Sequence, residues 1–141
     1  MIVLDTNVLS ALMRTKPDPP VIAWLDRQPA ESVWLTSITV FEVRFGMSIL
    51  EAGRRRRALE AAFKHLLEEE FENRILDFDG AAAEAAASIA AERHNNGRPS
   101  DLRDTLIAGI VSARRAILAT RNVRHFDDLA MTVVNPWDYR K

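Results

Sequence analysis

The chain has 141 residues, of which 48% are apolar, and its 19 basic residues nearly balance 20 acidic ones. That length and apolar content suit one ordinary domain with a buried core, so we expect a single domain over residues 1–141. The absence of cysteine excludes disulfides and thiolate chemistry, and the net charge of −1 excludes the broad positive field of a strongly basic nucleic-acid-binding domain.

The chain opens with a short apolar run, residues 2–4, that stops at Asp5. A run without polar alternation is typical of a strand buried on both faces inside a parallel sheet. Asp5 then follows the carboxyl end of the strand, where open α/β sheets bind ligands. Two interpretations stay open here: Asp5 faces a metal or a substrate, or it caps a helix that begins near Val8.

The same N-terminal run is too short to target the chain to a membrane. Three apolar residues before an acid, without a basic flank, indicate neither a signal peptide nor a membrane helix. Together with the lack of cysteine, this leads us to expect a soluble protein of a reducing cytoplasm.

Helices and short strands alternate through the rest of the chain. Helices are expected at residues 8–14, 21–27, 38–50, 54–71, 80–94 and 101–115, and strands at residues 33–36, 74–78, 116–119 and 131–134. Ser37, Asp79 and Ser100 are the expected caps of three of the helices. Strands separated by helices predict a three-layer α/β/α fold with a parallel sheet and right-handed crossovers.

Glu42 interrupts an apolar stripe in the helix at residues 38–50. The stripe also contains Ile38, Phe45 and Ile49, at the spacing of one helical face. A carboxylate carried toward a core needs a hydrogen bond, an ion pair or a cation. We favour a functional role for Glu42, and the alternative is an ordinary ion pair with Arg44 or Arg103.

Two acids, Asp101 and Asp104, begin the last long helix and lie three residues apart, on one side of its first turn. Acids at this position complement the helix dipole, which is a sufficient explanation for Asp101. Asp104 lies deeper, beside Leu106 and Ile107, and stays a candidate for function.

Other charged groups carry weaker signals. The run Arg54 to Arg57 would suit a polyanion, although a solvated helix face is the more usual explanation for such a run. His65, His94 and His125 lack the spacing of metal ligands, and we interpret them as surface or structural residues.

Asp5, Glu42 and Asp104 therefore form a set of three carboxylates, each at a strand end or on a helix that flanks one. Carboxylate oxygens are the ligands that Mg²⁺ and Mn²⁺ prefer, and such a site can activate water for attack on a phosphodiester. Other acid-based chemistries fit less well. A haloacid-dehalogenase phosphatase needs a second acid where Asn7 stands, and a response-regulator receiver needs a late lysine that this chain does not supply.

Several of these segments together resemble a PIN-domain ribonuclease of the VapC toxin type, over essentially the whole chain. The segments that carry the resemblance are VLDTNVL at residues 3–9, TVFEV at 39–43, DTLIA at 104–108, LATRNVRHF at 118–126 and VNPW at 134–137. The resemblance implies a five-stranded parallel sheet of order 3-2-1-4-5. It also implies that Asp5, Glu42 and Asp104 hold Mg²⁺ or Mn²⁺, supported by Thr6 and Thr120. A fourth acid of the family is replaced by Asn122, which puts a second metal in doubt.

The resemblance further implies a homodimer in complex with a small antitoxin, whose tail lies in an apolar groove and blocks the acids. DNA would be contacted only through that antitoxin, and RNA would be the substrate. Arg44, Arg98, Arg103 and Arg121 could contact RNA, or could be solvated or paired with acids. The alternatives are a PIN-like binding module without turnover and a DNA-directed nuclease of the same fold.

Overall fold

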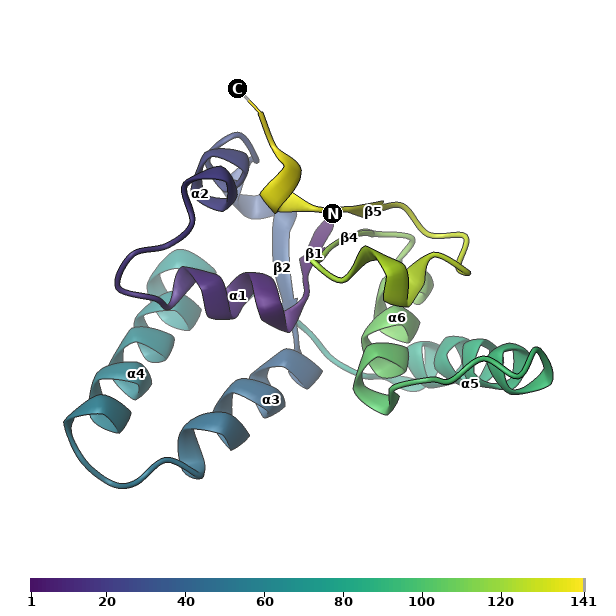
Figure 1. Ribbon diagram of the computed structural model, residues 1–141, viewed down its shortest axis with the longest axis horizontal. Helices are drawn as coiled ribbons and strands as arrows, with labels where there is room; N and C mark the ends of the chain where they lie inside the picture. Colours follow the sequence, from purple (N-terminus) through teal and green to yellow (C-terminus); the bar gives the residue numbers. More distant parts are fainter. Residues whose placement is uncertain (141) are drawn as a thin grey trace.

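The computed structural model describes residues 1–140 and contains five parallel strands (Figure 1). Their order in the sheet is β3-β2-β1-β4-β5, which confirms the predicted order. The strands are β1 (Ile2–Leu4), β2 (Val33–Thr36), β3 (Ile75–Leu76), β4 (Ile117–Ala119) and β5 (Val133–Val134). β1 pairs with both β2 and β4. The strand order therefore reverses at this central strand: β2 and β3 extend from it toward one edge of the sheet, and β4 and β5 extend toward the other. In α/β sheets such a reversal opens a crevice at the carboxyl ends of the strands.

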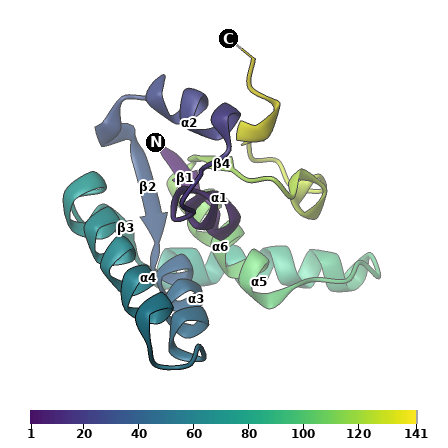
Figure 2. The ribbon, with the colours of Figure 1, turned by 60° about the vertical axis from the view of Figure 1, so that its left-hand side comes forward.

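Six α-helices cover the two faces of the sheet (Figures 1 and 2). They are α1 (Thr6–Leu12), α2 (Pro19–Asp26), α3 (Ser37–Ser48), α4 (Arg54–His65), α5 (Gly80–Asn95) and α6 (Leu102–Arg114). The core on one face packs α1 to α4 against Leu4, Leu35 and Ala119, and the core on the other packs α5 and α6 against Val3 and Leu118. Successive strand residues thus point to opposite cores, as the continuous apolar runs predicted.

Helices α5 and α6 approach each other closely. A Cβ placed on Gly109 of α6 would lie 2.6 Å from the Ala82 carbonyl oxygen and 2.6 Å from the Ala86 Cβ. Small residues on both helices therefore set their separation.

Several details of the predicted elements are wrong. The strands predicted at residues 74–78 and 131–134 are shorter, as β3 and β5. Thr36, and not Ser37, caps α3, and Asp101, and not Ser100, caps α6; each supplies the side-chain oxygen that accepts a first-turn amide. The helix predicted through Phe71 ends as α4 at His65 and continues as one π-helical segment, Leu66–Glu70.

Two shorter segments tie the C-terminal part to the sheet, a 3₁₀ turn at Val123–Phe126 after β4 and another at Pro136–Asp138 after β5. Trp137 packs against the core, and its Nε1 donates to Asp18 Oδ2 at 2.7 Å. Across residues 1–140, no helix combines the length and the apolar character that crossing a membrane requires.

Candidate active site

Asp5 and Thr120 lie side by side where β1 and β4 end. β1 and β4 are neighbours in register, with Leu4 opposite Ala119, so the next residue of each strand emerges at the same edge. The Asp5 amide donates to the Ala119 carbonyl at 2.9 Å, and Thr120 Oγ1 donates to Asp5 Oδ2 at 2.7 Å. The side chain of Asp5 is buried at the switch point of the sheet.

Asp5 also caps α1, which confirms the capping interpretation, whereas a role toward a metal or a substrate stays a prediction. Its Oδ1 accepts the Thr6 amide at 2.8 Å, and its Oδ2 accepts Nδ2 of Asn7 at 3.3 Å. Asn7 Nδ2 lies 3.1 Å from Thr120 Oγ1, and Asn7 Oδ1 accepts the Arg121 amide. Asn7 thus joins the two strand ends, and the carboxylate is fixed in orientation by neutral donors that leave its charge uncompensated.

Glu42 reaches the same place from α3. Thr6 Oγ1 donates to Glu42 Oε1 at 2.9 Å and lies 2.9 Å from Thr39 Oγ1, so one hydroxyl links α1 to α3. Glu42 Oε2 lies 3.6 Å from Arg103 Nη1, which is one of the two ion pairs considered from the sequence.

The apolar stripe that singled out Glu42 does not face the core. Phe45 and Ile49 are more than half exposed, whereas Thr39, Val43 and Met47 form the buried face of α3. The helix is rotated relative to the prediction because the threonine and valine positions pack against the sheet. Glu42 therefore lies at the boundary between the buried and exposed faces, with 18% of its side chain accessible.

Asp104 approaches from the first turn of α6. Asp101, which was predicted to lie in the first turn, is instead the cap of the helix and accepts the Asp104 amide at 3.1 Å. Asp104 Oδ2 accepts a hydrogen bond from His125 Nδ1 at 2.8 Å. His125 was predicted to be a surface or structural residue, and its contact with this acid could not be inferred from its spacing.

The three acids act on each other electrostatically. Burial raises the pKa of Asp5 from its ordinary value of 3.8 to about 6, and hydrogen bonds from Thr120 and the Thr6 amide oppose this rise. The negative charges of Asp104 and Glu42 raise the pKa of Asp5 further. Removing a carboxylate from water beside like charges disfavours its ionised form, and a cation would relieve both effects.

The donor chemistry of these side chains fits a hard divalent cation. They offer oxygen ligands from three carboxylates, the set that Mg²⁺ and Mn²⁺ prefer. Within residues 1–140, no three acidic or histidine side chains lie close enough to one another to hold an ion directly. Mg²⁺ ordinarily keeps several waters and takes one or two protein carboxylates, so a hydrated ion suits this spacing.

Of the other candidate residues, Asn122 and Arg103 contact the site, whereas Arg44, Arg98 and Arg121 have partners elsewhere. Asn122 is exposed, and its backbone amide donates to Thr120 Oγ1 at 3.0 Å. The four arginines considered as RNA contacts have partners within the chain. Two lie over aromatic rings, Arg44 over Phe63 and Arg121 over Trp137. The other two form ion pairs, Arg98 with Asp127 and Asp128, and Arg103 with Glu42.

Hollows in the surface adjoin the acids on two sides. One of about 380 Å³ is lined by Thr6, Glu42 and Arg103 together with apolar side chains that include Met13, Val43, Phe45, Met47 and Leu50. Another of about 370 Å³ is lined by Asp104, His125 and Arg124. The acids therefore lie between an apolar groove and a more basic one.

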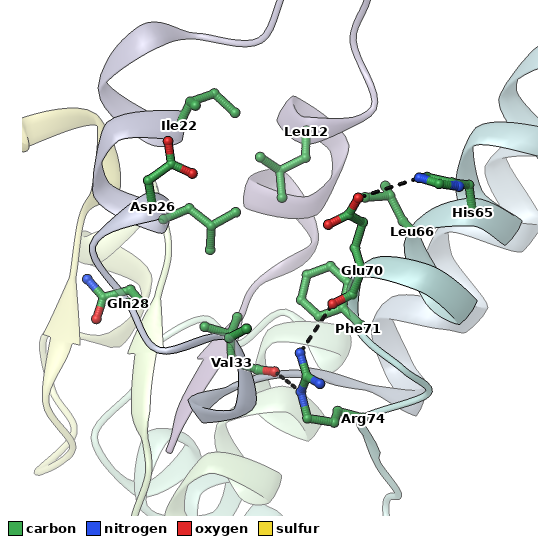
Figure 3. A pocket seen from close by; sticks show the side chains of 12 residues that line it. Leu12, Ile22, Asp26, Gln28, Val33, His65, Leu66, Glu70, Phe71 and Arg74 are labelled. Carbon is green, nitrogen blue, oxygen red and sulfur yellow. Dashed lines mark hydrogen bonds and ion pairs between the residues drawn. The ribbon is translucent and has the colours of Figure 1, made fainter.

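A further hollow of about 440 Å³ lies at the other end of the sheet (Figure 3). Leu12, Ile22 and Phe71 contribute to its apolar wall, and His65 and Glu70 pair at its rim. Val33 and Arg74 in the wall stand where β2 and β3 begin, whereas the acids follow strand ends. This hollow is therefore separate from the acids.

The chain is similar to known proteins over nearly its whole length. The model of the PIN domain family matches residues 2–131. The chain is 36% identical to the VapC ribonuclease Y4jK of Sinorhizobium fredii, over 98% of this chain and 99% of the relative. It is 35% identical to the toxin FitB of Neisseria gonorrhoeae, over 97% of this chain and 99% of that relative. Its fold is similar to that in the structure of FitAB bound to an IR36 DNA fragment, with a TM-score of 0.89 and 34% identity over 100% and 99% of the two chains.

Proposed function

Because the chain belongs to the PIN domain family, we propose that it is a metal-dependent endoribonuclease that acts as the toxin of a toxin–antitoxin pair. One observation carries the proposal: the buried carboxylate of Asp5 lies at the switch point of the sheet, where the charges of Glu42 and Asp104 raise its pKa further. The names of the relatives, a VapC ribonuclease and the toxin FitB, support RNA hydrolysis and a toxin role.

In this proposal Asp5, Glu42 and Asp104 hold Mg²⁺ or Mn²⁺. A bound ion of this kind activates water and neutralises charge that develops on a phosphodiester. The chain itself orients the acids: Thr120 donates to Asp5, and Thr6 donates to Glu42. These hydrogen bonds fix the orientation of both carboxylates, and the remaining oxygens also have partners, since Asp5 Oδ1 accepts the Thr6 amide and Glu42 Oε2 lies near Arg103.

The test compares RNA cleavage by the purified full chain, free of antitoxin, with added Mn²⁺ or Mg²⁺ and with chelator. Cleavage should require the metal, and Asp5→Asn should abolish it. Asp79→Asn is the matched control, because Asp79 also caps a helix after a strand but is nearly half exposed and pairs with Arg114. Asparagine is as good a cap as aspartate, so this variant should cleave normally.

Other results of the same assay would contradict the proposal. Cleavage of DNA in place of RNA would indicate a DNA-directed nuclease. No cleavage of either under any metal condition would indicate a binding module without turnover.

We further propose that a small DNA-binding antitoxin inhibits the chain. The apolar groove beside Thr6, Glu42 and Arg103 suits the tail of such a partner, since a segment lying there would block the approach to the acids. Solved structures of related complexes hold DNA, and we expect DNA contact here only through the partner. Phe45 is half exposed in that groove, so Phe45→Glu should weaken inhibition without reducing cleavage.

We expect the chain to form a homodimer. Its molar mass in solution, measured by light scattering with and without the antitoxin, tests this directly. A monomeric mass in both conditions would contradict the expectation.

A further inference from the structure

His125 makes a short contact with one of the proposed metal ligands. Its Nδ1 lies 2.8 Å from Asp104 Oδ2, across a gap of 21 residues in the chain. The contact occupies one oxygen of a carboxylate whose side chain is 20% accessible. The second oxygen of Asp104 is thereby given a defined direction.

The segment that carries His125 is held by two guanidinium groups. Arg93 Nη2 donates to the His125 carbonyl at 2.7 Å, and Arg98 Nη2 donates to the Arg124 carbonyl at 2.8 Å. Arg93 is 3% accessible, and its remaining donors bind Asp128 and Ser100. Phe126, next in the chain, is buried in the core. The backbone on both sides of His125 is therefore fixed relative to α5 and α6.

The same arginine also holds the start of α6. Arg93 Nη1 donates to Ser100 Oγ, and that hydroxyl shares a hydrogen bond with Thr105 in the first turn of α6, beside Asp104. The histidine and the acid it meets are thus positioned by one buried side chain. A surface contact that formed by chance would not have both of its partners braced in this way.

We propose that His125 is a positioning residue that orients the Asp104 carboxylate for a divalent cation; this inference rests on the proposed function. Hydrogen bonds to ligating carboxylates fix their orientation, and loss of such a partner typically weakens metal binding or activity by about 10- to 100-fold. The ring of His125 is half exposed and adds little to the core, so its contribution is to the direction of Asp104.

The test measures Mn²⁺ binding to the full chain by electron paramagnetic resonance of free Mn²⁺, with RNA cleavage as a second measurement. His125→Ala should weaken Mn²⁺ binding about 10-fold or more and lower cleavage, with little change in melting temperature. His125→Asn should retain Mn²⁺ binding, because its amide nitrogen occupies nearly the position of Nδ1. His125→Gln should not, because its nitrogen lies one bond farther from the backbone.

The matched control is His94→Ala, which removes another exposed histidine, from the last turn of α5, and should leave Mn²⁺ binding unchanged. Unchanged or tighter Mn²⁺ binding in His125→Ala would overturn the inference while leaving the proposed function intact. Equal behaviour of the Asn and Gln variants would also overturn it. A wild-type chain that binds no Mn²⁺ and cleaves no RNA would refute both the inference and the proposed function.

Discussion

The two groups of charged side chains that meet at His125 are built in opposite ways. The carboxylate cluster (Asp5, Glu42 and Asp104) gathers three like charges, and its hydrogen bonds to Asp5 come from neutral donors. The arginine cluster (Arg93, Arg98 and Asp128) joins opposite charges, with Arg93 donating to both oxygens of Asp128 at 2.9 and 3.0 Å. One group is complete within the chain, and the other has a single cation, Arg103 beside Glu42, against three carboxylates.

This difference separates charges that stabilise the fold from charges kept for function. The hydrogen bond from Arg93 lowers the pKa of Asp128, so that group contributes stability above its ordinary pKa, and the contribution is lost as pH falls. Burial raises the pKa of Asp5 to about 6. Its contribution to the stability of the fold is therefore present below pH 3.8 and is lost as pH rises through about 6. Carboxylates that destabilise the metal-free fold near neutral pH are typical of ligand sites.

The largest effect on stability should come from the arginine cluster. Arg93→Ala removes a buried guanidinium and leaves Asp128, Ser100 and the His125 carbonyl without its donors. Breaking a buried ion pair costs about 3–5 kcal/mol, and we expect about 3 kcal/mol because Asp128 is partly accessible. Urea unfolding of the metal-free chain measures this loss.

Arg114→Ala is the control for Arg93→Ala. Arg114 also pairs with an acid, Asp79, but both side chains are nearly half exposed, so the expected loss is below about 1 kcal/mol. Equal losses in the two variants would show that the arginine cluster is no more than a surface ion pair.

The pH dependence of stability tests the carboxylate cluster. The pKa of Asp5 rises from 3.8 to about 6, and about two pH units correspond to on the order of 3 kcal/mol. With chelator present, the wild type should lose stability relative to Asp5→Asn between pH 4 and pH 7 by that amount. Parallel curves for the two proteins would mean that Asp5 ionises in the folded chain as it does in water.

Metal binding should raise the stability of the protein only when the carboxylate cluster is intact. A ligand at 100 times its dissociation constant adds about 2.7 kcal/mol to the free energy of unfolding. We expect Mn²⁺ to raise the stability of the wild type and of Asp128→Asn by similar amounts, and to leave Asp5→Asn unchanged. If Mn²⁺ instead stabilised Asp5→Asn and not Asp128→Asn, the ion would bind at the arginine cluster, which would contradict the prediction.

The sequence predicted the sheet better than the faces of the helices. Apolar runs such as residues 2–4 and 116–119 have few ways to be buried, so the strand positions followed from them, whereas the strand order followed from the resemblance to PIN domains. The orientation of α3 depends on which of its two apolar faces the sheet covers, and the exposed face with Phe45 and Ile49 was the wrong choice. The caps differed by one residue because Thr36 and Ser37, or Ser100 and Asp101, are equally good caps locally.

Residues of the candidate site that directly follow a strand could be predicted from the sequence. Residues whose role depends on a partner far along the chain could not. Asp5 and Thr120 meet because β1 and β4 are neighbours. Arg93 looks like an ordinary cation in the last turn of a helix, and its partner Asp128 lies 35 residues later. His125 likewise gains its partner Asp104 only when the segment after β4 folds back over α6.

Arg103 provides the smallest test, because it is a cation that the carboxylate cluster already possesses. It lies 3.6 Å from Glu42 and is half exposed, so the pair is worth less than about 1 kcal/mol. Arg103→Gln should therefore change stability by no more than that and tighten Mn²⁺ binding by up to about five-fold, since a competing positive charge is removed. Calorimetric titration of Mn²⁺ into the two proteins measures the difference. Weaker binding in Arg103→Gln would mean that the guanidinium orients Glu42, and the carboxylate cluster would then be partly completed by the chain itself.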